Sequence, residues 1–138
     1  MSFLLDTNVI SEPRKAIPDQ RVLAWLRRQA EAGAETYLSV LVVGEVRKGI
    51  EQVRPRDPRQ ADSLEEWLAG LVGVYADRIL PITTAVAEEW GRIHVAAQPP
   101  LVDGLMAATA KVNRLTLATR NVADVRRTGV PVVNPFEG

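Results

Sequence analysis

The chain has 138 residues, of which 46% are hydrophobic and 25% are charged. This composition is typical of a folded globular protein, and the length is that of one domain, so we expect a single domain spanning 1–138. The 17 Lys and Arg residues balance the 17 Asp and Glu residues, so no net charge attracts nucleic acid and any such binding needs a local patch.

Cysteine and histidine usage narrows the possible chemistry. The chain has no cysteine and only one histidine, His94, which excludes disulfides, thiol nucleophiles and zinc sites built from these residues. Any bound metal ion therefore needs oxygen ligands. The apolar N-terminal run lacks a basic leader and stops at Asp6, and no apolar stretch approaches the roughly 20 residues of a membrane helix. We expect a cytoplasmic protein with no membrane association.

Short segments of β-strand composition alternate with longer segments of helical periodicity. In chain order the pattern predicts a strand at 3–5, a helix at 19–33, a strand at 36–40, helices opening at Ser39 and at Asp57, a strand at 78–82, a helix opening at Thr83, a helix at 103–113, and strands at 115–119 and 130–134. This alternation, with few hairpin signals, indicates an α/β fold with a mostly parallel five-stranded sheet flanked by helices.

Three carboxylates stand alone in uncharged stretches. Asp6, Glu45 and Asp103 are each the only charged side chain in a stretch of at least 11 residues. Because the flanking residues are mainly apolar, each carboxylate is expected in a buried segment, where an ionised group is costly unless it is paired. Asp6 also follows the first strand, and sites in open α/β sheets form at the carboxyl ends of strands. The pattern favours a site for a hard divalent cation.

Local structural roles remain open for these residues. Asp6 could cap a helical turn that begins near Asn8, and Asp103 could cap the helix that follows it. Glu45 lies inside a helix and cannot cap its start, although it could pair with Lys48 on an exposed face. Coincidence of all three is the less favoured interpretation.

Polar residues also follow the fourth expected strand. Thr119, Arg120 and Asn121 come where that strand ends, and Asn121 could simply form a turn, a use that suits asparagine. Asp124 is a possible fourth acid, which we interpret as a residue of a surface turn. Five basic residues near the expected site could contact phosphates, namely Arg14, Lys15, Arg47, Lys48 and Arg120. Of these, Arg120 and Arg47 are the predicted substrate-binding residues.

Four stretches carry a family resemblance: LLDTNVISEP, YLSVLVVGEVRKGI, VDGLMAATAKV and LTLATRNVADV. Together they resemble the PIN-domain ribonucleases, and among them the VapC-type and FitB-like toxins of bacterial type II toxin–antitoxin modules. The stretches run in family order and cover nearly the whole chain. The resemblance implies a PIN-like three-layer α/β domain.

The resemblance implies a catalytic set. In that family the equivalents of Asp6, Glu45 and Asp103, with a fourth residue at the position of Asn121, line an acidic pocket that holds Mg²⁺ or Mn²⁺. Many members have aspartate at the fourth position, and an amide brings no charge, so we expect one tightly held ion with Asp6, Glu45 and Asp103 as its ligands. The implied reaction is hydrolysis of RNA phosphodiester bonds by a metal-activated water.

Supporting residues and partners follow from the same resemblance. Thr7 is expected to fix Asp6 through its hydroxyl, and Thr119 or Asn121 to hold a water in the outer shell of the metal. The implied partners are an RNA substrate, a second copy of the chain in a homodimer, and a cognate VapB-type antitoxin whose C-terminal segment blocks the pocket.

Three other classes fit parts of the pattern. A haloacid-dehalogenase-like phosphatase needs a second aspartate where this chain has Asn8. A receiver-like module needs an acceptor aspartate after the third strand and a lysine after the fifth, and neither is present. A non-catalytic PIN-like binding module stays open, because Asn121 removes one acid from the pocket.

Overall fold

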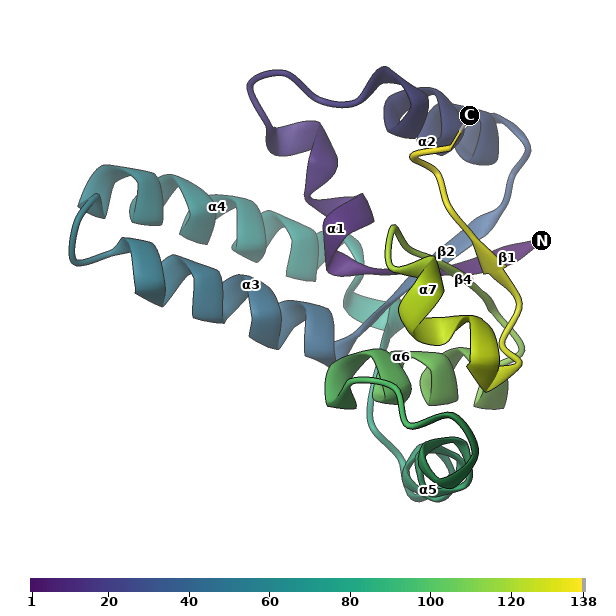
Figure 1. Ribbon diagram of the computed structural model, residues 1–138. Helices are drawn as coiled ribbons and strands as arrows, with labels where there is room; N and C mark the ends of the chain where they lie inside the picture. The colour runs from purple at the N-terminus through teal and green to yellow at the C-terminus, as the bar shows by residue number, and fades with distance from the viewer. Residues whose placement is uncertain (138) are drawn as a thin grey trace.

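Five parallel strands form the centre of the structure, a computed structural model that describes residues 1–137 (Figure 1). The strands are β1 (Ser2–Leu5), β2 (Glu35–Ser39), β3 (Ile79–Leu80), β4 (Thr116–Ala118) and β5 (Val132–Val133). Their order in the sheet is β3-β2-β1-β4-β5, and all four neighbouring pairs are parallel. The predicted parallel five-stranded sheet is confirmed. The chain builds outward on one side of β1 and then returns to add β4 on the other side.

The two edge strands are shorter than the sequence predicts. β3 and β5 each keep two residues of the expected segments 78–82 and 130–134. Pro81 directly follows β3 and Pro131 directly precedes β5. Proline has no N–H to donate, so it interrupts the ladder of hydrogen bonds between strands.

Helices connect the strands and cover the sheet. The α-helices are α1 (Thr7–Ile10), α2 (Gln20–Glu31), α3 (Val40–Val53), α4 (Pro58–Val74), α5 (Thr84–Ala97), α6 (Leu101–Val112) and α7 (Val122–Val125), with single 3₁₀ turns η1 (Glu12–Arg14), η2 (Ala76–Arg78) and η3 (Arg126–Thr128). The predicted N-caps Asp19, Ser39, Asp57 and Thr83 are confirmed, since each side chain accepts a hydrogen bond from a backbone N–H in the first turn.

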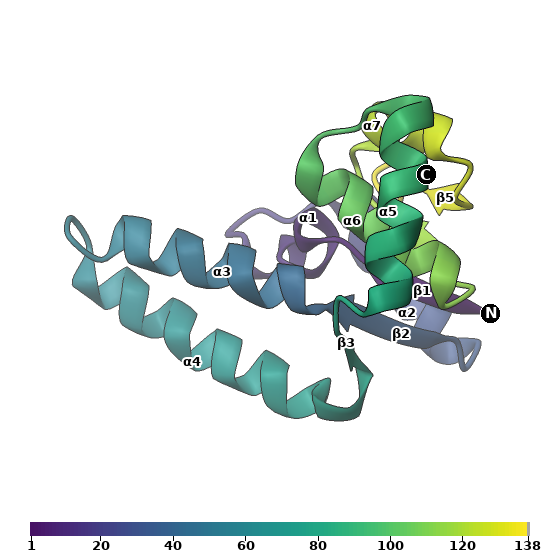
Figure 2. The same cartoon turned by 90° about the horizontal axis from the view of Figure 1, so that it is seen from below.

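The helices form two layers on either side of the sheet. Helix α2 covers one face, α5 and α6 cover the other, and α3 and α4 form a hairpin that projects beyond the sheet (Figures 1 and 2). The alternation of β1 serves both layers: Phe3 and Leu5 pack in one apolar cluster with Trp25 of α2, and Leu4 packs in the other with Met106 of α6. The three-layer architecture predicted from the resemblance is confirmed.

Helix α6 begins earlier than the sequence predicts. It starts at Leu101 with Pro100 at the N-cap position, so Asp103 lies inside the first turn and does not cap the helix. Pro100 has extended backbone angles and, as a proline, directly precedes a helical start without losing a needed N–H. The carboxylate of Asp103 is therefore available for another role. No helix within residues 1–137 combines the length and apolarity needed to cross a membrane.

Glycine at position 104 lets α6 lie against α5. A Cβ atom at Gly104 would be 3.0 Å from Cγ of Pro99 and 3.2 Å from Cδ1 of Trp90. We expect Gly104→Ala to overpack this contact and to lower the free energy of unfolding by about 1–3 kcal/mol, measured by urea denaturation. Gly91→Ala on α5 is the matched control, because a Cβ there meets nothing within 4 Å. Equal stability of the two variants would contradict the tight contact.

Candidate active site

The candidate site lies at the carboxyl ends of β1 and β4. Asp6 directly follows β1, and Thr119 directly follows β4. These neighbouring strands flank the point where the strand order reverses, which is where open α/β sheets form their ligand crevices. The sheet topology therefore places Asp6 and Thr119, which the sequence singles out, at the edge where a ligand crevice is expected.

Asp6 is buried and held from two strands. Its side chain is 6% exposed, its Oδ1 accepts a 2.7 Å hydrogen bond from the backbone N–H of Thr7, and its Oδ2 accepts a 2.7 Å bond from the hydroxyl of Thr119. Asp6 is thus the N-cap of α1 and also one of the three acids that the sequence singles out. The sequence predicts that Thr119 holds a water, whereas in the structure its hydroxyl donates directly to Asp6.

Glu45 approaches the same place from α3. Its carboxylate is exposed, which corrects the expectation of a buried segment, because α3 turns Val42 and Val46 toward the core instead. The hydroxyl of Thr7 donates a 2.7 Å hydrogen bond to Oε1 of Glu45. The prediction that this hydroxyl binds Asp6 is therefore wrong, because its partner is Glu45. Thr7 uses its backbone for Asp6 and its side chain for Glu45, and so joins the two acids.

The pKa of Asp103 depends on its burial and on the negative charges near it. Burial raises the pKa of Asp103 above its usual value, and the charges of Asp6, Asp124 and Glu45 raise it further, in that order of size. A hydrogen bond from the side chain of Asn121 acts in the opposite direction. Asp6, Asp124 and Glu45 thus lie near enough to Asp103 for their charges to act on it, and Asn121 hydrogen-bonds it. We call Asp6, Glu45, Asp103 and Asp124 the acidic cluster.

Asp124 contributes more than the sequence suggests. It lies in the single turn of α7, three residues after Asn121, so the two side chains share one side of that turn. Its charge acts on Asp103 more strongly than that of Glu45 does. Asp124 is exposed in this turn, as the sequence interpretation has it, and it also supplies a fourth carboxylate near the neutral Asn121. Only the i, i+3 spacing in the sequence could have indicated this.

Asn8 is a supporting residue that sequence reasoning missed. Its Nδ2 lies 3.4 Å from Oδ2 of Asp6 and 3.5 Å from Oγ1 of Thr119, while its Oδ1 accepts a 3.1 Å hydrogen bond from the backbone N–H of Arg120. The amide thus links the ends of β1 and β4. Its position two residues after Asp6 was the available signal.

The donor set is suited to a hard cation that keeps part of its water shell. No three Asp, Glu or His side chains among residues 1–137 lie close enough to enclose a metal ion by themselves. Mg²⁺ usually binds through one or two carboxylates and retains several waters, so a close cage is not required. A cation would also offset the repulsion that raises the pKa of Asp103. The residues present therefore fit Mg²⁺ or Mn²⁺ bound with water.

The two predicted substrate-binding arginines lie in different surroundings. Arg47 pairs with Glu51 at 3.1 Å and with Glu65 of α4 at 2.6 Å. The structure therefore does not bring Arg47 to the acids of the candidate site. The guanidinium of Arg120 lies 3.8 Å from the ring centroid of Phe136, while its backbone is held by Asn8. The structure places Arg120 beside the site and Arg47 in the α3–α4 hairpin.

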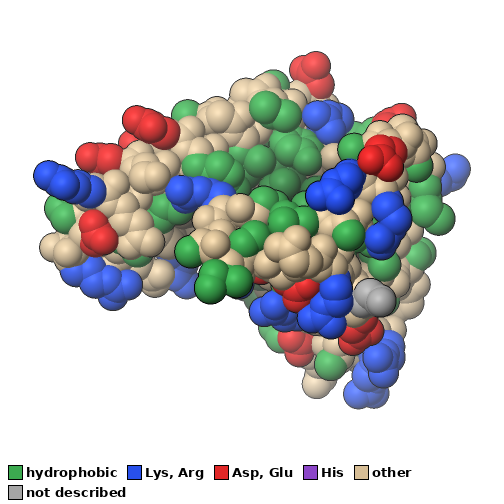
Figure 3. Space-filling model, turned by 90° about the horizontal axis from the view of Figure 1, so that it is seen from above, with side chains coloured by type: hydrophobic (Ala, Val, Ile, Leu, Met, Phe, Trp, Pro, Cys, Tyr) green, Lys and Arg blue, Asp and Glu red, His purple; other side chains and the backbone are tan. Residues whose placement is uncertain are grey.

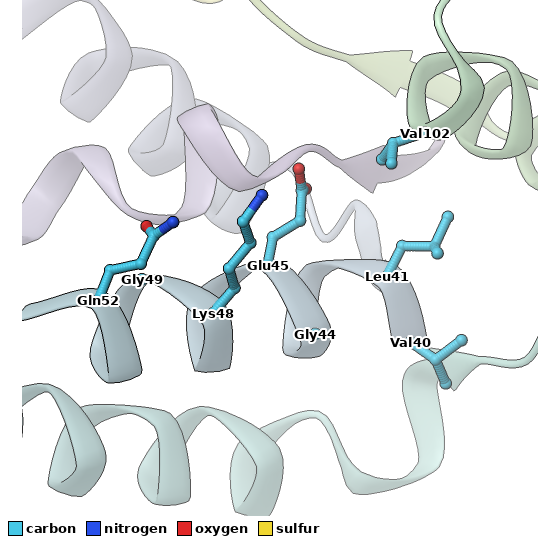
Figure 4. Close-up of a pocket in the computed structure, with 8 residues that line it drawn as sticks. All are labelled: Val40, Leu41, Gly44, Glu45, Lys48, Gly49, Gln52 and Val102. Carbon is cyan, nitrogen blue, oxygen red and sulfur yellow. The ribbon is translucent and has the colours of Figure 1, made fainter.

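A pocket of about 470 Å³ adjoins Glu45 (Figure 4). It runs along α3 from Val40 to Gln52 and is closed at one side by Val102, one residue before Asp103. Lys48, one turn after Glu45, lines the same pocket. The open surface beside the acidic cluster is therefore formed by α3 and the start of α6.

Known proteins resemble the chain over nearly its full length. Toxin FitB of Neisseria gonorrhoeae is 37% identical over 140 residues, covering 97% of this chain and 98% of that protein. VapC ribonuclease Y4jK of Sinorhizobium fredii is 32% identical over 140 residues, covering 98% of each. The crystal structure of FitAcB from Neisseria gonorrhoeae superposes with a TM-score of 0.90 at 36% identity, covering 99% of both chains.

The matched family is consistent with the fold and with the position of the acidic cluster. The family model described as PIN domain matches residues 3–129, which include Asp6, Glu45, Asp103 and Asp124. This membership removes the phosphatase and receiver interpretations of the sequence. The chain belongs to the PIN domain family.

Proposed function

We propose that this protein is a Mg²⁺- or Mn²⁺-dependent endoribonuclease and the toxin of a toxin–antitoxin pair. The observation that carries the proposal is the hydrogen-bonded arrangement at the carboxyl ends of β1 and β4, where Thr119 holds Asp6 and Thr7 joins Asp6 to Glu45. The charges of these acids and of Asp124 act on the nearby Asp103. The relatives named as a toxin and as a VapC ribonuclease support the same activity.

Asp6 and Asp103 would hold the cation, with Glu45 and Asp124 beside it. When bound, the cation would polarise the scissile phosphate and lower the pKa of a water, which is the hydrolytic chemistry that carboxylate sites of this kind use. Asn121 would add a neutral oxygen donor.

The chain's own contacts assign further roles. Thr119 and the backbone of Thr7 fix both oxygens of Asp6, so this carboxylate is held in one orientation before substrate arrives. Thr7 occupies Oε1 of Glu45, which leaves Oε2 to accept a hydrogen bond from the attacking water and to orient it toward the phosphate. Arg120 would contact a substrate phosphate.

The link made by Asn8 gives a test of this orientation. We expect Asn8→Ala to lower the rate of RNA cleavage about 10- to 100-fold, because Asp6 and the backbone of Arg120 lose a common anchor. The measurement is the single-turnover rate at saturating Mn²⁺. Asn113→Ala at the end of α6 is the control, since that amide also bonds a backbone group but lies at the other end of the sheet. A rate equal to that of the control would remove Asn8 from the site.

An antitoxin partner completes the proposal. The face that carries α2 has hydrophobic side chains gathered in a hollow, with charged side chains at its edges (Figure 3). Beside η1 and α4, a groove of about 350 Å³ combines Leu64 and Trp67 with the cations Arg14 and Lys15. Such a surface suits a peptide with apolar and acidic side chains, and we propose that an antitoxin supplies this peptide. The homodimer implied by the resemblance remains a prediction.

Cleavage of a mixed set of defined RNAs tests the activity. The purified protein should cut at least one RNA in the presence of Mn²⁺ or Mg²⁺ and none after chelation. Cutting that is unaffected by chelation would reject the metal-dependent mechanism. An absence of cutting at saturating metal, for RNAs of every structural class, would favour a non-catalytic binding module.

A further inference from the structure

The pocket along α3 has a polar face that continues from the acidic cluster. Glu45, Lys48 and Gln52 are spaced three and four residues apart, so they share one side of the helix. Figure 4 shows their side chains rising from α3 on the same side, with the carboxylate of Glu45 nearest α6. A ligand that leaves the acidic cluster along α3 therefore passes Lys48 and then Gln52.

Lys48 differs from its basic neighbours because its charge is not used within the protein. Arg47 is paired with Glu51 and Glu65, and Arg54 is paired with the same two acids and with Asp62. None of the ion pairs among residues 1–137 includes Lys48. Its ammonium group thus stands free at the edge of a pocket whose inner end is negatively charged.

Two glycines leave the pocket wall low. A Cβ atom at Gly44 or at Gly49 would meet nothing within 4 Å, so no packing contact inside the described chain requires glycine there. Glycine inside a helix costs about 1 kcal/mol relative to alanine. Bare helical backbone on both sides of Lys48 lets an extended polymer approach closely. This access is consistent with the unpaired charge of Lys48 being available to such a polymer.

We propose that this pocket holds the RNA strand next to the scissile bond, with Lys48 bound to a backbone phosphate. The inference rests on the proposed function and adds a substrate-binding residue to it. An acidic catalytic cluster repels a polyanion, so a strand that enters it needs a cation on the adjoining surface. Lys48 supplies that charge on the helix that carries Glu45, and a lysine contact of this kind positions the strand without reading its sequence.

Equilibrium RNA binding tests the role of Lys48. The full chain carrying Asp103→Asn, which prevents cleavage, would be titrated against a fluorescein-labelled single-stranded RNA of mixed sequence over a series of NaCl concentrations. We expect Lys48→Gln to weaken binding several-fold and to reduce the slope of log K against log[salt] by about 0.7, the value for one phosphate contact on a single strand. Lys48→Arg should retain the slope.

Arg56→Gln provides the matched control. Arg56 is an exposed cation in the turn between α3 and α4, so this variant has the same net charge as Lys48→Gln and a distant change. Equal affinity and slope for Lys48→Gln and Arg56→Gln would overturn the inference. A change of apparent mass on size-exclusion chromatography in Lys48→Gln alone would also overturn it, by showing that this surface joins protein copies. An absence of RNA binding by every form, including the one with Lys48 intact, would instead reject the proposed function.

Discussion

Replacing Asp103 by asparagine should abolish most RNA cleavage and leave the protein folded. The change keeps the size of the side chain but removes the charge that lies among Asp6, Asp124 and Glu45. Loss of one group that stabilises transition-state charge typically costs on the order of 10²–10³-fold in rate. We expect a loss of at least this size in the single-turnover rate constant at saturating Mn²⁺, because Asp103 would also hold the cation.

Asp77→Asn is the control for this result. Asp77 lies in η2, on an exposed turn before β3, and the substitution makes the same chemical change away from the carboxyl ends of β1 and β4. It should cleave at the native rate. Full activity in Asp103→Asn, with circular dichroism showing both variants folded, would place the chemistry elsewhere or assign it to a contaminating nuclease.

The central part of the fold could be predicted because its signals are local. Helix starts are set by single residues, and Asp19, Ser39, Asp57 and Thr83 cap the helices that the sequence predicts. The sequence overestimates the lengths of the edge strands β3 and β5, because a strand's length depends on its partner as well as on its composition.

The acids of the site could be predicted, but their contacts could not. An isolated charge in an apolar stretch is visible in the sequence, and the charges of Asp6 and Glu45 do act on Asp103. The contact of Thr7 with Glu45 and that of Asn8 with Thr119 depend on how distant segments are placed side by side. The position of Asn8 two residues after Asp6 indicates a contact with Asp6 but not the bridge to Thr119.

The phase of a helix explains the remaining differences. Arg47 and Lys48 are adjacent in sequence but lie about 100° apart around α3, so one faces α4 and the other lines the pocket beside Glu45. The sequence offers both residues as substrate contacts, and the structure places only Lys48 in the pocket beside Glu45. The effect of Asp124 on Asp103 likewise depends on the short helix α7, which is not apparent from the sequence alone.

Divalent cations should stabilise the native protein strongly and the Asp103→Asn variant weakly. A ligand that binds only the folded state at 100 times its dissociation constant adds about 2.7 kcal/mol to the free energy of unfolding. For a chain of 138 residues this corresponds to a rise in Tm on the order of 10 °C. The measurement is thermal unfolding with Mg²⁺ or Mn²⁺ against chelated protein. Equal shifts in both proteins would show that the cation binds without Asp103.

The metal-free proteins should show the opposite order of stability. Because the pKa of Asp103 is raised in the folded state, its ionised form destabilises the fold at neutral pH, and Asp103→Asn should then be the more stable protein. As the pH falls through the raised pKa, the folded native protein takes up a proton before the unfolded chain does, so its stability rises toward that of the variant. The difference in Tm should therefore be largest at neutral pH and shrink with acid. A difference that does not change with pH would show that neither burial nor the neighbouring carboxylates raise the pKa of Asp103, and would remove one reason for this edge of the sheet to hold a cation.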